Sequence, residues 1–200
     1  MAEIEYFYSL ASPFTYLAGD GLEKIADEAG AQIHYRPADF PAIFAETGGL
    51  PPAKRHPFRQ EYRLQELRRL SAHAGLPINL HPKFWPVDPV PATLAVLAVA
   101  EAGGDAGTLS RAFLSACWAE ERNIADDATI GEVLVENGHE ADAISAASSA
   151  QRGVFDANTA RAMGKGVFGA PFYIVGDERF WGHDRLSFVA AHLKAAGSST

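Results

Sequence analysis

The 200-residue sequence predicts an α/β protein in which a mixed sheet, built from both ends of the chain, carries a large all-helical insertion. Three observations predict this class. Two strand-like segments flank a helical pattern near the N-terminus, the middle of the chain shows only helical spacings, and strand character returns near the C-terminus before a last helical pattern. The predicted order is therefore βαβ, a helical block, and ββα.

The N-terminal third supplies the βαβ unit. "EIEYFYS", from Glu3, is short and rich in aromatic residues, which predicts a buried strand. Apolar residues then follow helical spacing from Pro13 to Ala29, and Gly30 is a common helix stop, so one helix is expected over 13–29. "AQIHYRP" alternates apolar and polar residues and stops at Pro37. A helix between two strands favours parallel pairing of those strands.

The rest of the chain completes the sheet. Helical spacings dominate residues 56–163, and "GGLPPAKRHP" (48–57) has the composition of a loop. "PFYIV", a Gly176-Asp177 turn signal and "ERFW" predict a hairpin, followed by a helix with one apolar face. This is the arrangement of a thioredoxin-like fold. We expect residues 1–37 and 165–200 to form the thioredoxin-like domain and residues 38–164 to form the helical insertion domain.

Composition excludes several classes of function. The net charge of −8 argues against nonspecific binding of nucleic acid, since phosphate contacts need a clustered basic surface. The start, "MAEIEYFY", is acidic where a secretory signal would be basic, and no run approaches the ~18 apolar residues of a membrane helix. A cytoplasmic protein without membrane association is expected, and the single Cys117 excludes an internal disulfide. The histidines show no metal-ligand spacing, so no metal site is expected.

Ser12 stands where the first strand meets the first helix, with Pro13 at the favoured first helical position. One interpretation is an ordinary N-cap. The other is a catalytic hydroxyl directed at a thiol, because a helix N-terminus favours an anion such as a thiolate. Redox proteins of this topology hold the first cysteine of a Cys-x-x-Cys pair at this position. Here "SPFT" replaces the pair, which excludes disulfide exchange through it.

The second signal is "GVFGAPFYIVGDERFWGHDRL" (166–186). Pro171 directly precedes a strand, and a cis bond there would turn the backbone of Ala170 towards Ser12. "GKGVFG" matches a dinucleotide-binding pattern by letter, but it precedes a strand instead of opening a helix, so we discount it. In "GHDR", Asp184 serves either as a helix cap or as the partner of a ligand ammonium group.

Charged and aromatic residues in the middle of the chain have two interpretations each. The basic residues around 54–69 are interleaved with Glu61 and Glu66, which predicts a solvated helix face. They are Lys54, Arg55, Arg59, Arg63, Arg68 and Arg69. Lys54 and Arg36 remain candidates for binding an anionic ligand. The loop "KFWPVDPVP" (83–91) holds aromatic residues that either pack in the core or line an apolar pocket.

Three segments together resemble a known family: "SPFTYLA", "RNIADDATIGEVL" and "GVFGAPFYIVGDERFWGHDRL". The chain resembles the 2-hydroxychromene-2-carboxylate isomerases, relatives of kappa-class glutathione transferases, over nearly its whole length. The resemblance implies a thioredoxin-like fold, glutathione as cofactor, a small aromatic substrate from aromatic catabolism, and a homodimer.

The same resemblance implies roles for individual residues. Ser12 would donate a hydrogen bond to the glutathione sulfur, Ala170 before a cis Pro171 would pair with the cysteinyl backbone, and His183 and Asp184 would hold the γ-glutamyl end. The thiolate would add reversibly to the substrate, allow rotation about a former double bond and leave, so that glutathione is not consumed. Further expected contacts are Lys54 with glutathione, and Arg36, Phe84 and Trp85 with the substrate.

Two positions depart from the family's pattern. Gly49 replaces a common asparagine beside glutathione, which removes a side-chain contact, and Asp88 in "PVDP" would repel a carboxylate substrate. Two other functions remain open: a kappa-like glutathione transferase that forms stable conjugates, and a noncatalytic protein that binds thiols or peptides.

Overall fold

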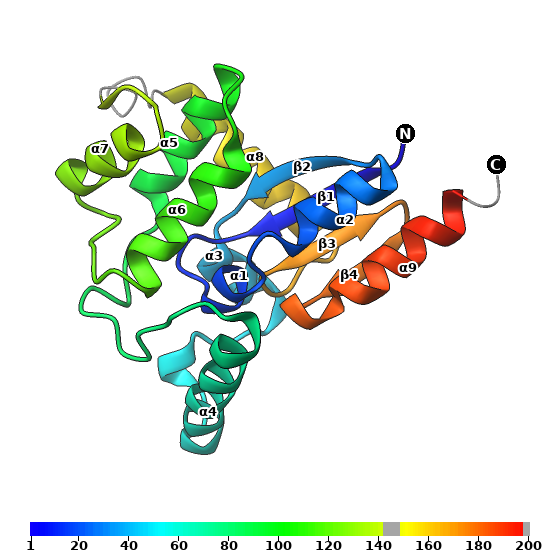
Figure 1. The fold of residues 1–200 in the computed structure, drawn as a ribbon. Coiled ribbons are helices and arrows are strands. Elements are labelled where there is room, and N and C mark those ends of the chain that lie inside the picture. The colour runs from blue at the N-terminus through cyan, green and yellow to red at the C-terminus, as the bar shows by residue number, and fades with distance from the viewer. Residues whose placement is uncertain (142–148, 198–200) are drawn as a thin grey trace.

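A four-stranded mixed sheet in the order β2-β1-β3-β4 lies at the centre of the computed structural model, which describes residues 1–141 and 149–197 (Figure 1). β1 pairs in parallel with β2, whereas β1 with β3 and β3 with β4 are antiparallel. The predicted mixed α/β sheet of thioredoxin-like type is confirmed. The strands are β1 (Glu3–Tyr8), β2 (Gln32–Pro37), β3 (Phe172–Val175) and β4 (Glu178–Trp181).

Helices occupy all the connections except the β3–β4 hairpin (Figure 1). Those between β1 and β2 are α1 (Pro13–Leu17) and α2 (Gly21–Ala29). Those between β2 and β3 are α3 (Phe40–Thr47), the 3₁₀ turn η1 (Pro52–Lys54), α4 (Pro57–Ala74), α5 (Val90–Glu101), α6 (Ala106–Trp118), α7 (Asp127–Glu136) and α8 (Ser149–Gly164). After β4 come η3 (His183–Arg185) and α9 (Leu186–Gly197). Within the described ranges, no helix combines the length and apolar character required to cross a membrane.

The prediction of one helix over 13–29 is wrong. Gly19 adopts a left-handed backbone conformation (φ +58°), which a continuing α-helix does not contain, so α1 ends and α2 begins anew at Gly21. Ser12 therefore precedes a helix of only five residues. The helix-dipole contribution expected at Ser12 is correspondingly small, since it depends on several aligned turns.

Helix α3 was not among the individual helices expected from the sequence, although its boundary signals are present. The Asp39 side chain accepts a hydrogen bond from the Ala42 N–H at 3.2 Å, and Gly48 ends the helix in a left-handed conformation (φ +75°). α3 brings Phe40 and Phe44 to the same end of the sheet as Ser12, where all three line one cleft.

The two faces of the sheet are covered by different helices. Alternate residues of a strand point to opposite faces, so Ile4, Tyr6 and Tyr8 of β1 join the larger core, whereas Phe7 joins a smaller one. The larger core includes apolar residues of α2, α5, α6, α7 and α9, and the smaller core includes residues of α3 and α8. β1 is therefore buried from both sides, which fixes the strand that leads into Ser12.

An aromatic cluster ties the sheet to the inserted helices. Tyr6 stacks on Tyr173 of β3 with ring centroids 5.2 Å apart and on Tyr8 at 4.7 Å. The Tyr8 hydroxyl in turn hydrogen-bonds Ser110 of α6 at 2.7 Å, in the buried core. The end of β1 is thus anchored to the helical insertion directly before the loop that carries Ser12.

The nearly buried carboxylate of Glu5 links β1 to its neighbour β2 and to helix α8. Glu5 accepts a hydrogen bond from Arg36 of β2 at 2.7 Å and another from Arg161 of α8, and Lys165 lies 4.0 Å away. Burial raises the pKa of Glu5, but the hydrogen bond from Arg161 and the charges of Arg36 and Arg161 outweigh it, so the pKa lies below its ordinary value of 4.5. Glu5 is ionised in the folded protein at neutral pH.

We expect Glu5→Gln to reduce the free energy of unfolding at pH 7 by about 1–3 kcal/mol, because it leaves the arginines of β2 and α8 without their carboxylate. A depressed folded-state pKa contributes stability above the unfolded-state pKa and loses it as pH falls through the folded-state value. The difference between wild type and variant, measured by urea unfolding, should be constant above about pH 5.5 and shrink below about pH 4.5. A difference independent of pH would show that Glu5 does not act through its charge.

Candidate functional site

A cleft of about 670 Å³ opens where β1 ends and α1 begins. Ser9, Ala11 and Ser12 line it from this loop, and Gly169 and Ala170 line it from the segment before β3. β1 and β3 run antiparallel with Phe7 opposite Phe172. The residues after β1 and those before β3 therefore lie at the same end of the two strands. The structure thereby brings Ser12 and Ala170 together in one cleft.

Ser12 is half-buried and caps α1: its Oγ accepts a hydrogen bond from the Thr15 N–H at 3.2 Å. The capping interaction uses a lone pair of the hydroxyl oxygen and leaves the O–H proton free to be donated. The two interpretations of Ser12 are therefore compatible. The same hydroxyl caps the helix and presents a donor to the cleft.

The Ala170–Pro171 peptide bond is cis, as the sequence predicts. The Pro171 carbonyl accepts a hydrogen bond from the Gly182 N–H at 2.9 Å, which connects the start of β3 to the end of β4. Ala170 itself is half-buried and lines the cleft. A second cis bond, Trp85–Pro86, lies in the opposite wall and was not expected from the sequence.

His183 and Asp184 lie behind the cleft and not in its lining. The His183 ring stacks on Phe14, a residue of the cleft wall, with centroids 5.7 Å apart, and its Nε2 is buried without a hydrogen-bond partner. Burial lowers the pKa of His183 despite the neighbouring Asp184, so the ring is neutral at pH 7. Asp184 pairs with Arg185 at 3.0 Å. The assignment of this pair to the γ-glutamyl end stays a prediction.

Of the other residues proposed to bind glutathione or substrate, some line the cleft and others do not. Trp85 lines the cleft, whereas Phe84 is exposed under the Lys83 ammonium group, 5.0 Å from its ring centroid, outside the lining. Lys54 is exposed on η1, also outside the lining. Arg36, on β2, forms an ion pair with Glu5 of β1 and does not line the cleft. Of the residues proposed for an anionic ligand or substrate, the structure places Trp85 alone beside Ser12 and Ala170.

Three cleft residues were interpreted from the sequence as a solvated helix face. Arg55, Arg59 and Arg63 all line the cleft, on α4 and directly before it. The spacing of four between Arg59 and Arg63 is the signal that places these two on one side of α4. No Asp or Glu among the described residues lines this cleft, and none of the three arginines pairs with a carboxylate there. Most arginines outside the cleft form an ion pair with Asp or Glu. These are Arg36, Arg69, Arg111, Arg122, Arg152, Arg161 and Arg185.

The two departures from the family's pattern have structural explanations. A Cβ on Gly49 would lie 2.6 Å from Cδ1 of Phe44, so glycine allows the Phe44 ring to pack against this loop in the cleft wall. Asp88 accepts a hydrogen bond from the Val90 N–H at 3.0 Å at the start of α5 and lies outside the cleft lining. It is therefore not placed in the cleft wall to repel a carboxylate.

Cys117, the cysteine of the chain, lies outside the cleft lining. Burial raises the pKa of the Cys117 thiol to about 12, so this cysteine is not a nucleophile at neutral pH. Across residues 1–141 and 149–197, side chains of His, Cys, Asp and Glu form no group of three able to hold a metal ion. The chemistry that the cleft itself offers is a hydroxyl donor, a backbone edge at Ala170, aromatic walls and guanidinium groups.

Comparison with known proteins agrees with this geometry. Residues 3–194 match the DSBA-like thioredoxin domain. The chain is 29% identical to the 2-hydroxychromene-2-carboxylate isomerase of Sphingobium xenophagum over 193 residues, which cover 95% of this chain and 97% of that protein.

Solved structures show the same fold. A 2-hydroxychromene-2-carboxylate isomerase superimposes with a TM-score of 0.79 at 22% identity, covering 98% of this chain and 97% of that one. The cytosolic disulfide reductase DsbM of Pseudomonas aeruginosa, solved with GSH, gives a TM-score of 0.69 at 20% identity, covering 96% and 99%. The resemblance inferred from the three motifs is confirmed, and the chain belongs to the DSBA-like thioredoxin domain family.

Proposed function

We propose that this protein is a glutathione-dependent isomerase that converts a 2-hydroxychromene-2-carboxylate, an aromatic ring-cleavage product, to a trans-o-hydroxybenzylidenepyruvate. The observation that carries the proposal is Ser12, whose hydroxyl caps α1 and which lines the same cleft as Ala170. The relative from Sphingobium xenophagum bears the name of this activity, and the structure of the related reductase DsbM contains GSH.

The cleft residues fit glutathione. Glutathione carries a thiol, two carboxylates and peptide groups, and the cleft offers a hydroxyl donor, cationic side chains and a free backbone edge. The guanidinium groups of Arg55, Arg59 and Arg63 lack carboxylate partners within the described chain, so an anionic ligand would satisfy charges that the protein leaves unpaired. Ala170 precedes β3 and lines the cleft, and its backbone would pair with the cysteinyl residue of glutathione.

Ser12 would hold the sulfur in its reactive form. A free thiol has a pKa of about 8.5, and a hydrogen bond donated to the sulfur favours the thiolate over the thiol. The positive charges of the arginines act in the same direction. Because α1 has only five residues, the hydroxyl and the arginines carry this effect instead of the helix dipole.

Glutathione, when bound, would supply a thiolate that adds to the substrate double bond and leaves again, so that no thiol is consumed. The chain's own contribution is to orient that sulfur through Ser12, to hold the substrate against aromatic walls such as Trp85 and Phe40, and to stabilise negative charge with arginine. The same site would also support a transferase that forms a stable conjugate, and stoichiometry separates the two reactions.

We expect Ser12→Ala to lower turnover of the chromene carboxylate about 10- to 100-fold, since it removes the donor that stabilises the thiolate. Calorimetric titration of glutathione at pH 7, in buffers of different ionisation enthalpy, should show less proton release than in the wild type. Ser9→Ala removes a second cleft-lining serine, whose Oγ accepts from the Ala11 N–H at 3.2 Å, and serves as the matched control. Ser12→Thr should preserve both signals. Unchanged turnover and proton release in Ser12→Ala would contradict the assignment of Ser12.

The total free thiol should remain constant while substrate is converted, because the proposed isomerisation returns the thiolate. A thiol-reactive dye added to quenched samples at several conversions measures this directly. If free thiol instead falls mole for mole with substrate, the protein is a glutathione transferase of the kappa-like type.

A further inference from the structure

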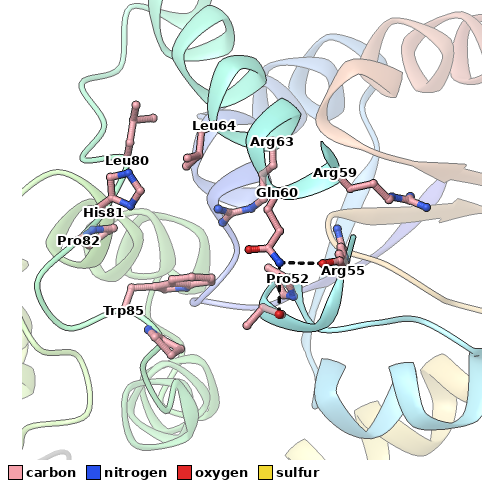
Figure 2. Close-up of a pocket in the computed structure, with 12 residues that line it drawn as sticks. Pro52, Arg55, Arg59, Gln60, Arg63, Leu64, Leu80, His81, Pro82 and Trp85 are labelled. Carbon is pink, nitrogen blue, oxygen red and sulfur yellow. Dashed lines mark hydrogen bonds between the residues drawn. The ribbon is translucent and has the colours of Figure 1, made fainter. Parts of the chain in front are cut away.

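A second cavity of about 270 Å³ adjoins the main cleft. The two share the lining residues Pro52, Arg55, Arg59, Arg63, Trp85 and Pro86. Figure 2 shows the second cavity, with Arg55, Arg59, Arg63 and Trp85 among the labelled residues. The remaining walls of the second cavity include Leu64, Leu80 and Pro82, which are apolar. Cavities of about 150 Å³ accommodate benzene, so this one has room for a larger flat ring system.

Arg63 forms the charged part of that shared wall. Its guanidinium carbon lies 4.9 Å from the Trp85 ring centroid and 5.9 Å from that of Trp118, so aromatic faces hold it in place. Its Nη2 is buried and has no hydrogen-bond partner. Burial and the nearby Arg55 lower the pKa of Arg63 to about 10, which leaves it protonated at neutral pH. No carboxylate of the described residues pairs with Arg63, so an anionic ligand in the cavity would neutralise its charge.

The position of Arg63 is linked to Ser12. The Trp85 indole Nε1 donates a hydrogen bond to the Ala11 carbonyl at 3.2 Å, in the residue directly before Ser12. In Figure 2 the Arg63 side chain lies on the Trp85 side of the cavity, whereas Arg59 extends away from Trp85. Among the three cleft arginines, Arg63 is therefore the one held against the ring that contacts the Ser12 loop.

We propose that Arg63 and this second cavity bind the carboxylate and ring of a flat aromatic acid, so that Arg63 selects aromatic carboxylates over neutral analogues. The apolar walls take the ring, and the Arg63 guanidinium group, which lines the cavity, takes the carboxylate through a charge-assisted hydrogen bond. The ring acid's role as co-substrate of glutathione rests on the proposed function. The selection for a carboxylate rests on the geometry of Arg63 alone.

The test compares chromone-2-carboxylate with neutral chromone as probes, with binding followed by tryptophan fluorescence in the presence of glutathione. We expect the wild type to bind the carboxylate about 10- to 100-fold more tightly than chromone. Arg63→Gln should remove most of this preference without changing the affinity for chromone, and Arg63→Lys should retain part of it. Arg68→Gln is the matched control, since Arg68 is exposed on the same helix, outside both cavities. Thermal melting of each variant verifies that it is folded.

Three outcomes would overturn the inference. They are equal affinity of the wild type for the two probes, binding of neither probe, and an equal loss of preference in Arg68→Gln and Arg63→Gln. Glutathione titrations on the same proteins separate this inference from the proposed function. If Arg63→Gln weakens glutathione binding and leaves the probe preference intact, Arg63 serves glutathione and the inference fails alone. If the wild type does not bind glutathione but prefers the carboxylate through Arg63, the proposed function fails and the inference stands.

Discussion

The loop between β1 and α1 is held from two sides, and the position of the cleft depends on this constraint. On one side the Tyr8 hydroxyl hydrogen-bonds Ser110 of α6, and on the other the Ala11 carbonyl accepts from the Trp85 indole. Both partners belong to the segment between β2 and β3. The inserted residues therefore do more than cover the sheet, because they anchor the backbone on the N-terminal side of Ser12. A thioredoxin-like sheet without these contacts would present the same serine on a loop free to move.

The second organising feature is a positively charged cleft in a protein whose net charge is negative. The chain carries a net charge of −8, yet its cleft is lined by three arginines and no carboxylate from the described residues. Elsewhere, most arginines are neutralised by Asp or Glu, so the unpaired charge is concentrated where Ser12 lies. An anionic ligand would therefore be attracted to the region in which, by the proposed function, Ser12 stabilises a thiolate. Binding and activation of the sulfur would then draw on the same side chains.

The sequence predicted that Ser12 and the segment before β3 lie close together, and the structure brings Ser12 and Ala170 into one cleft. Ser12 and Pro171 stand at strand ends, and two strands of one sheet bring their ends together without further information. The place of Arg55, Arg59 and Arg63 in the cleft was missed because their interleaving with Glu61 and Glu66 predicts only a solvated face. Their true environment depends on the loop around Trp85, which is distant in sequence. Arg36 was expected to bind a ligand because its partner Glu5, itself shared with Arg161 of α8, is not visible in local spacing.

The central claim is that this cleft holds a thiol as its anion. It is tested most directly by following the ultraviolet absorption of thiolate while glutathione is bound and the pH is varied. The account predicts a thiolate band at pH 7 that bound glutathione shows and free glutathione lacks, with a midpoint below the ordinary value of about 8.5. In Ser12→Ala the midpoint should move back towards that value. Bound glutathione that titrates as it does in free solution, with or without Ser12, would contradict the account.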